Sequence, residues 1–271
     1  MGFYRKKGLT SSQLKIIALV IMTLDHLAKY QLLTKSPYIN ELMRITGRIA
    51  APLFLFLLVE GLRHTRNRRN YIMRLYTASV IMEFLRVLAV ILNMGIPMGN
   101  IFQTFFYAAL YITCIDKIIK SEKFDLNIIK YIVFIFIPLI LTAARDFFGL
   151  NLYENMLLNI LLPPPFEVEF SFFFVLLGIA WYFVDNKNIN CIILAVLSVI
   201  CGVVDMRVFN NPSNNFTFWH LFTPNQWLMI LAVVFIALYN GEKGAGGFKY
   251  FFYIYYPVHQ VLFLIAAIIL Q

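Results

Sequence analysis

The chain has 271 residues, of which 61% are hydrophobic and only 14% are charged. Soluble domains carry roughly 25% charged residues, so this chain has too few charges to cover a water-soluble globule of its size. The same charges suffice for the two ends of a helical bundle whose sides face lipid. The composition therefore excludes a soluble domain and predicts an all-α, polytopic transmembrane helix bundle.

The formal net charge is +9. In a soluble protein such a charge favours nucleic-acid binding, but basic loops of a membrane protein set its topology and meet anionic lipid headgroups. No RNA- or DNA-binding motif is visible, so the expected partner is the lipid bilayer and not nucleic acid. The three cysteines have neither metal-ligand spacing nor nearby histidines, which predicts no disulfide framework and no metal site.

Nine apolar runs follow one another along the chain, most of them close to the roughly 20 residues needed to cross ~30 Å of hydrocarbon. The first, Leu14 to Leu33, follows a basic N-terminus and lacks a signal-peptide cleavage site, so an uncleaved helix is expected. The segment 152–162 is too short to span and is predicted to be interfacial or re-entrant. The other eight runs are residues 44–62, 72–92, 97–119, 128–150, 168–184, 189–208, 226–239 and 250–270.

The basic residues support this count of about nine spans. Most of the 23 lysines and arginines fall in loops on one side of a nine-span arrangement. Because positively charged loops stay in the cytoplasm, the N-terminus is predicted to be cytoplasmic and the C-terminus to lie outside. No linker, low-complexity tract or repeat divides the chain, so a single integral membrane domain over residues 1–271 is expected.

Ionisable residues inside the spans are the most informative part of the sequence. Asp25, His26, Glu83, Arg86 and His259 lie at similar depth, given about 1.5 Å of rise per residue. Each is costly near the bilayer centre unless it faces the bundle interior and has a partner. They are expected to converge on one polar cavity if their helices are neighbours. The alternative for Glu83 and Arg86, spaced i,i+3, is that they only neutralise each other.

Arg44 and Arg48 share one face at the outer start of the second span. Like charges spaced i,i+4 repel, so they require an anion, either a buried carboxylate such as Asp25 or a substrate group. The alternative is an anchor at the membrane surface. Arg48 lies deeper and is followed by Ala51 and Pro52, which favours an inward role for it.

The densest cationic stretch runs from Gly61 to Arg69 in a predicted cytoplasmic segment. Guanidinium groups bind phosphate in a bidentate manner, so this stretch suits a phosphate-bearing ligand. The competing explanation is topology alone, because basic loops stay inside. The cationic candidates are Arg63, His64, Arg66, Arg68 and Arg69.

Three blocks carry a family resemblance: KIIALVIMTLDH (residues 15–26), RITGRIAAPLFLFLLVEGLRHTRNRRNYIMRL (residues 44–75) and KYFFYIYYPVH (residues 249–259). Together they resemble the TraX family of bacterial membrane proteins, whose founding member is tied to N-terminal acetylation of conjugative F-pilin. The family itself is similar to multipass acetyltransferases that draw acetyl-CoA from the cytosol.

The resemblance implies an acyltransferase in the bacterial cytoplasmic membrane. It would move an acetyl group from acetyl-CoA to an amine or hydroxyl of an acceptor, which could be a pilin-like peptide, a glycan or a small molecule. His26 or His259 is the expected general base, Asp25 would orient a partner, and Arg48 would hold substrate or the oxyanion. The five cationic candidates named above, Arg63, His64, Arg66, Arg68 and Arg69, would bind the donor.

Two alternatives remain open at this point. Intramembrane Asp, His and Arg residues also form proton relays, which would suit a proton-coupled transporter or flippase. No inverted repeat supports that interpretation. A non-catalytic membrane assembly factor would use the same polar residues for packing. The sequence leaves open the acceptor, the choice between the two histidines and the oligomeric state.

Overall fold

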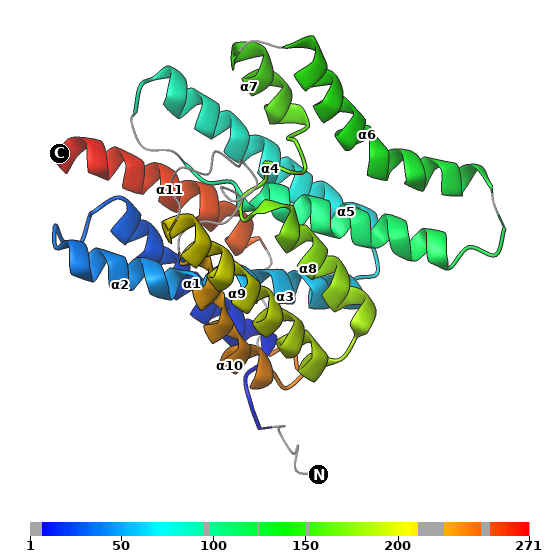
Figure 1. Ribbon diagram of the computed structural model, residues 1–271, viewed down its shortest axis with the longest axis horizontal. Coiled ribbons are helices and arrows are strands. Elements are labelled where there is room, and N and C mark those ends of the chain that lie inside the picture. The colour runs from blue at the N-terminus through cyan, green and yellow to red at the C-terminus, as the bar shows by residue number, and fades with distance from the viewer. Residues whose placement is uncertain are drawn as a thin grey trace. The chain divides into compact units, whose positions relative to one another are not determined.

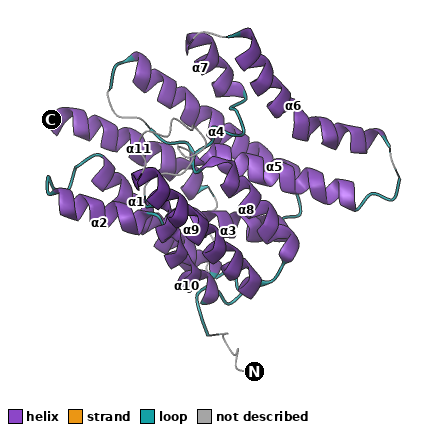
Figure 2. Ribbon diagram, in the orientation of Figure 1, coloured by secondary structure: helices purple, strands orange, loops and turns teal. Residues whose placement is uncertain are grey.

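The computed structural model describes residues 7–94, 98–123, 125–149, 152–210, 225–244 and 250–270. These residues form helices and connecting turns, and no β-strand occurs among them beyond an isolated bridge between Leu9 and Tyr239 (Figure 2). The predicted all-α class is therefore confirmed. The chain divides into two compact units, unit 1 with Met1–Leu57 and Val184–Gln271, and unit 2 with Leu58–Phe183 (Figure 1). The single membrane domain over residues 1–271 stays a prediction.

Unit 1 is organised around its first helix. Helix α1 (Ser11–Lys29) packs against α2 (Pro37–Gly47) and α11 (Phe251–Leu270). Helix α9 (Lys187–Asn210) packs against the 3-10 helix η2 (Gln226–Leu231) and α10 (Ala232–Ala237). Backbone hydrogen bonds join these two groups of helices, because N–H groups just before and at the start of α1 donate to carbonyls after α10: Leu9 to Leu238, Ser11 to Glu242 and Ser12 to Lys243.

Unit 2 has its most buried helix in the middle. Helix α5 (Ile101–Ile119) packs between α4 (Arg68–Ile91) and α6 (Leu126–Phe148), and α7 (Leu152–Leu161) packs against α4. The remaining helices touching this unit are α3 (Ala50–His64), which begins in unit 1, and α8 (Ser171–Val184). Thirteen side chains of α5, including polar ones, are buried, so α5 forms the core on which the polar residues of its neighbours converge.

Five helical segments are long and apolar enough to cross a membrane: Ser11–Lys29, Pro37–His64, Leu126–Arg145, Lys187–Val204 and Phe251–Leu270. Only 11% of the Leu126–Arg145 window is buried, so this apolar surface suits contact with lipid. Helices α4 and α5 have the length but not the required apolar composition, while α8 and the Gln226–Ala237 segment are shorter. These five candidate spans indicate a membrane protein, and the count of nine spans and the cytoplasmic N-terminus stay predictions.

Helix α6 begins at a charged cap. The Asp125 carboxylate accepts hydrogen bonds from the Asn127 side-chain amide at 2.9 Å and from the backbone N–H groups of Asn127 and Ile128 at 2.9 and 3.0 Å. These bonds favour the ionised form. The side-chain bond from Asn127, followed by the backbone bond from Ile128, holds the pKa of Asp125 below its usual value.

The lowered pKa makes the cap sensitive to pH. Asp125→Ala should lower the thermal unfolding midpoint of the detergent-solubilised protein near neutral pH, because it removes the helix cap. The pKa is depressed in the folded state, so the stabilisation is present above the unfolded pKa and is lost as the pH falls through the folded pKa. The difference between variant and wild type should therefore shrink between about pH 7 and about pH 3. A difference of constant size would contradict this assignment, and Asp125→Asn is the uncharged control.

Candidate functional site

Two histidines from opposite ends of the chain meet inside unit 1. His26 on α1 and His259 on α11 are 6% and 4% exposed. The Nδ1 atom of His26 lies 2.6 Å from the Nε2 atom of His259, and the ring centroids are 4.9 Å apart. The structure thus brings together the two histidines that the sequence placed at similar depth.

The surrounding acceptors determine which ring nitrogens carry protons. Nδ1 of His259 lies 2.7 Å from the backbone carbonyl oxygen of Tyr255, which only accepts, so this nitrogen carries a proton. In neutral His259, Nε2 is then an acceptor, and Nδ1 of His26 must donate to it. The second nitrogen of a neutral His26, Nε2, is left with a lone pair and has no hydrogen-bond partner among the described residues. The pair therefore presents one basic nitrogen, on His26.

Aromatic side chains fix the orientation of this pair. The Tyr255 ring stacks on His259 with centroids 4.8 Å apart, and Tyr256 meets both imidazoles edge-on. The Thr23 hydroxyl donates to the Leu19 carbonyl, so the Tyr255 hydroxyl, 2.7 Å away, must donate to Thr23. These contacts connect α1 and α11 about one turn before the histidines and restrict rotation of the rings.

Asp25 faces the second helix of unit 1 instead of the histidine pair. Its Oδ1 atom lies 3.4 Å from Nη1 of Arg44. Arg48 and Lys29 also act on the Asp25 carboxylate electrostatically. The sequence left two anions open as the partner of Arg44, a buried carboxylate and a substrate group. In the structure, the carboxylate next to Arg44 is that of Asp25. The roles assigned to Asp25 and Arg48 in catalysis stay predictions, and the geometry places both on the α1–α2 side of His26.

The close approach of α1 and α2 depends on Gly47. A Cβ atom added to Gly47 would lie 2.5 Å from Cβ of Asp25 and 2.6 Å from its Oδ1. Glycine-to-alanine exchange usually stabilises a helix by about 0.5–1 kcal/mol. Here Gly47→Ala should instead destabilise the protein by about 1–3 kcal/mol, because Asp25 and α1 must shift.

Thermal or denaturant unfolding in detergent would measure the effect of Gly47→Ala. Gly202→Ala is the matched control, since Gly202 lies in α9 and its nearest atom, Cβ of Trp227, is 3.3 Å from the added carbon. If the two alanine variants had equal stability, the contact between Gly47 and Asp25 would not limit the packing of α1 on α2.

The predicted cationic segment separates into two groups in unit 2. Arg63 donates from Nη1 to Glu60 at 2.6 Å and from Nη2 to the Tyr182 carbonyl at 3.1 Å. Arg68 donates to Asp116 at 2.7 Å and also to the Tyr182 hydroxyl. These two arginines therefore join the ends of α3 and α4 to α5 and α8. The side chains of the other three candidates are exposed: His64, Arg66 and Arg69.

Glu83 and Arg86 form an ion pair on α4. Nε of Arg86 lies 2.9 Å from Oε1 of Glu83. The other carboxylate oxygen accepts from the side-chain amides of Gln103 at 2.9 Å and Asn100 at 3.3 Å. The i,i+3 pairing considered from the sequence is present. Convergence of this ion pair with the histidines stays a prediction.

Several residues that shape these sites were not identified from the sequence. The Tyr255 carbonyl orients His259. The sequence signal for this contact was that the two residues are four positions apart on one helix. Gly47 is the last residue of α2 and lies between Arg44 and Arg48, where a small residue permits close approach. Asn100 and Gln103 are polar residues spaced i,i+3 in an apolar run, a pattern that itself indicates an internal polar contact.

Comparisons with known proteins cover nearly the whole chain. A protein-family model described as TraX protein matches residues 10–267. The probable fimbrial assembly protein FimC, serogroup H1, of Dichelobacter nodosus is 27% identical over 277 residues, spanning 98% of this chain and 99% of that protein. No solved structure gives a significant match. The family resemblance inferred from the three sequence blocks is confirmed.

Proposed function

The chain belongs to the TraX family, and from this membership we propose that it is a membrane-embedded acetyltransferase. It transfers an acetyl group from cytosolic acetyl-CoA to an amine or hydroxyl of an acceptor. The observation that carries the proposal is the buried hydrogen bond between His26 and His259, which leaves one basic nitrogen on His26. An amine or hydroxyl needs such a base to lose its proton as it attacks a carbonyl carbon.

The histidine pair handles one proton in two stages. Nε2 of His26 accepts the proton of the attacking amine or hydroxyl, and the proton on Nδ1 shifts to Nε2 of His259 along their hydrogen bond. The positive charge then lies on His259, where the Tyr255 carbonyl oxygen stabilises the Nδ1–H group. Reversal of this shift returns a proton to the leaving group.

The bond changes balance without any further reagent. The donor supplies an acetyl group activated as a thioester. A carbon–nitrogen or carbon–oxygen bond forms at its carbonyl carbon, the carbon–sulfur bond breaks, and the sulfur leaves as thiolate. The proton removed from the acceptor neutralises that thiolate. Arg48 is the proposed guanidinium that stabilises negative charge on substrate, and Asp25 pairs with Arg44 and attracts Arg48 electrostatically.

The relative from Dichelobacter nodosus points to an acceptor class. Its name describes a fimbrial assembly protein. We therefore assign the acceptor as the N-terminal amine of a pilin-type or fimbrial subunit, met in the bacterial cytoplasmic membrane. In this proposal the subunit meets the histidine base within the membrane.

The transfer of label tests this function. Purified protein in nanodiscs would receive acetyl-CoA labelled in the acetyl group and a synthetic peptide with the free N-terminal amine of a pilin-type subunit. The expected result is acid-stable label on the peptide and an equal amount of free CoA thiol. The same peptide with a blocked N-terminus is the control. Flux of peptide across proteoliposomes without acetyl-CoA, and without label transfer, would instead support a transporter.

The exposed cations of the segment 64–69 are the proposed contacts for the phosphates of CoA. Arg63 and Arg68 already donate to protein acceptors, so Arg66 and Arg69 are the guanidiniums that remain exposed. Replacing both by glutamine should weaken acetyl-CoA binding by roughly tenfold or more, because each charged hydrogen bond to phosphate contributes about 1.5–3 kcal/mol before solvent screening.

Isothermal titration with acetyl-CoA would measure this loss. Lys117→Gln together with Lys123→Gln is the control for net charge, because it also removes two exposed positive charges, from another predicted cytoplasmic segment. The kcat of the Arg66→Gln, Arg69→Gln protein should remain near the wild-type value at saturating donor. Unchanged donor affinity would assign the segment to topology alone.

A further inference from the structure

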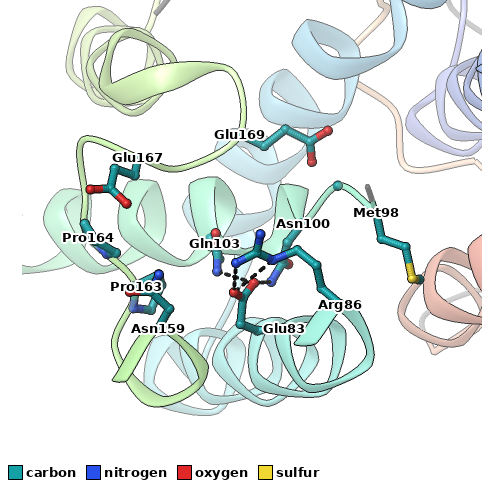
Figure 3. Close-up of a pocket in the computed structure, with 11 residues that line it drawn as sticks. Glu83, Arg86, Met98, Asn100, Gln103, Asn159, Pro163, Pro164, Glu167 and Glu169 are labelled. Carbon is teal, nitrogen blue, oxygen red and sulfur yellow. Dashed lines mark hydrogen bonds and ion pairs between the residues drawn. The ribbon is translucent and has the colours of Figure 1, made fainter. Parts of the chain in front are cut away.

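Unit 2 contains a polar cavity that the proposed function does not use. It lies between α4, the start of α5, the end of α7 and the segment leading to α8 (Figure 3). Its volume is about 220 Å³. One water molecule occupies roughly 30 Å³ in the liquid, whereas a pocket for a drug-sized ligand is larger than this cavity, so any organic occupant is small. The polar lining includes Glu83, Arg86, Gln103, Asn159, Glu167 and Glu169.

Hydrogen bonds within unit 2 hold the walls of this cavity. The hydroxyl of Tyr107 on α5 donates to the backbone carbonyl of Pro163. Arg145 on α6, with a side chain that is 9% exposed, donates to Asn159 at 3.0 Å and to Glu167 at 2.5 Å. The end of α7 and the segment after it are thus attached to both α5 and α6, so the groups that line the cavity have defined positions.

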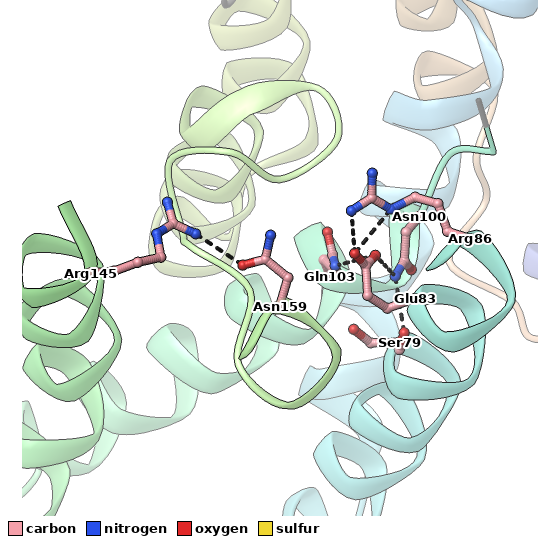
Figure 4. A network of polar contacts seen from close by, with 7 residues as sticks. All are labelled: Ser79, Glu83, Arg86, Asn100, Gln103, Arg145 and Asn159. Carbon is pink, nitrogen blue, oxygen red and sulfur yellow. Dashed lines mark hydrogen bonds and ion pairs between the residues drawn. The ribbon is translucent and has the colours of Figure 1, made fainter. Parts of the chain in front are cut away.

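Charged neighbours determine which polar atoms are left for a ligand. A carboxylate only accepts, so Gln103 turns its Nε2 group to Glu83, at 2.9 Å, and its Oε1 atom away. A guanidinium only donates, so Asn159 turns its Oδ1 atom to Arg145 and its Nδ2 group away. Arg86 donates to Glu83 from Nε and Nη2, which leaves Nη1. Figure 4 shows each of these three remaining atoms turned away from the charged partner.

Two donors and one acceptor of the lining therefore remain. None of the three has a hydrogen-bond partner within the described ranges of the chain: Nη1 of Arg86, Nδ2 of Asn159 and Oε1 of Gln103. A cation offers no acceptor to the two donors. An anion offers no donor to the Gln103 oxygen, and the carboxylates of the lining repel it. An uncharged ligand with both a donor and an acceptor matches all three atoms.

We propose that this cavity binds a peptide group, an uncharged carboxamide with its carbonyl and N–H groups on adjacent atoms. The carbonyl oxygen has two lone pairs, so it accepts from both Arg86 and Asn159, while the N–H donates to Gln103. The bond from Arg86 is charge-assisted and therefore stronger than a neutral one. The apolar lining residues Met98 and Pro164 suit the carbon atoms that flank a peptide bond. This assignment does not depend on acetyl transfer.

N-methylacetamide, which contains a single peptide group, is the probe for this site. Saturation-transfer NMR would measure its binding to the whole protein in nanodiscs of phosphatidylcholine and phosphatidylglycerol, with empty nanodiscs as the background. We expect saturable binding with a Kd of roughly 1 mM, because so small a ligand makes few contacts. The absence of saturable binding would mean that the cavity holds only water, and it would overturn the proposal.

Methyl acetate is the matched control ligand. It has nearly the same shape and the same carbonyl oxygen, but an ester oxygen stands in place of the N–H group. Its binding should be weaker by at least about tenfold, because the Gln103 oxygen would face an acceptor instead of a donor. Equal affinities for the two ligands would contradict the proposal. This comparison uses the unaltered protein, so it is decisive even if a variant fails to fold.

Asn159→Asp tests the donor on α7. An aspartate keeps an oxygen for Arg145 but replaces the N–H group on the cavity side by a second oxygen. The affinity for N-methylacetamide should fall at least about tenfold. Asn70→Asp, which adds the same charge at an exposed residue of α4 outside the lining, should leave it unchanged. Unchanged affinity in the folded Asn159→Asp protein would contradict the site.

Competition distinguishes a peptide from another source of the same carboxamide. N-acetylglycine N-methylamide carries peptide groups, whereas N-acetylglucosamine carries an N-acetyl group on a sugar whose hydroxyls need further partners. The peptide analogue should displace carbon-13-labelled N-methylacetamide at the lower concentration. Displacement at a lower concentration by the sugar would contradict the assignment to a peptide group.

Discussion

Replacing His26 with glutamine should lower acetyl transfer by about 10²- to 10⁴-fold, the usual contribution of a general base. Glutamine retains an N–H group that can donate to Nε2 of His259, so the packing of α1 on α11 is largely preserved. It offers no nitrogen that can accept a proton from the acceptor. Binding of acetyl-CoA should be unchanged, which separates a lost base from a misfolded protein. The label-transfer assay, run at saturating donor, measures the loss.

His259 has a different expected effect. A glutamine at position 259 can still accept the hydrogen bond from Nδ1 of His26 through its carbonyl oxygen, but it takes up no proton. The loss of activity should be smaller than for His26→Gln, and the pH dependence of kcat should change because the charge then stays on His26. Tyr255→Phe, which keeps the carbonyl and the stacked ring, is the matched control. Full activity of both histidine variants would end the proposal of a histidine base.

The second large effect concerns stability. Glu83 is 1% exposed, and Arg86 and two amides converge on its carboxylate. Glu83→Ala leaves a guanidinium and two amide groups without their acceptor. The loss for a fully buried pair is about 3–5 kcal/mol. Because the Arg86 side chain is 32% exposed, the expected destabilisation is lower, about 2–3 kcal/mol.

A double-mutant cycle tests this expectation. The protein with Glu83→Ala and Arg86→Met together should be more stable than the sum of the single effects predicts, because no unpaired charge remains. Denaturant unfolding in detergent would give all four free energies of unfolding. Additive losses would show that Glu83 and Arg86 do not stabilise the folded state through their ion pair.

The helices were largely predictable because lipid imposes a strong pattern on the sequence. Apolar runs of nearly 20 residues located α1, α4, α5, α6, α9 and α11 to within a few residues at most ends. Helix α2 starts at Pro37, well before the predicted start at Arg44. The first turns of α2 are amphipathic, so they lack the apolar run from which the start was predicted. Proline is favoured in the first turn of a helix, so α2 can begin at Pro37 without such a run.

The candidate site was predictable only in part. The cost of burying a histidine predicts that His26 and His259 have partners, and the structure shows each as the partner of the other. The proton positions depend on which ring nitrogen faces the Tyr255 carbonyl, a detail that spacing does not determine. Arg68 donates a hydrogen bond to Asp116, which lies far away in the sequence. The sequence alone therefore did not distinguish Arg68 from an exposed cation such as Arg69.

Nitrogen-15 NMR of histidine-labelled protein in nanodiscs tests the arrangement of protons directly. Near neutral pH, both Nδ1 atoms of His26 and His259 should give signals of protonated nitrogen, and both Nε2 atoms should give signals of nitrogen with a lone pair. Assignment would come from the His26→Gln and His259→Gln proteins. A proton on Nε2 of His26 in the resting protein would contradict the account. This nitrogen would then be unable to take up the proton of the attacking amine or hydroxyl.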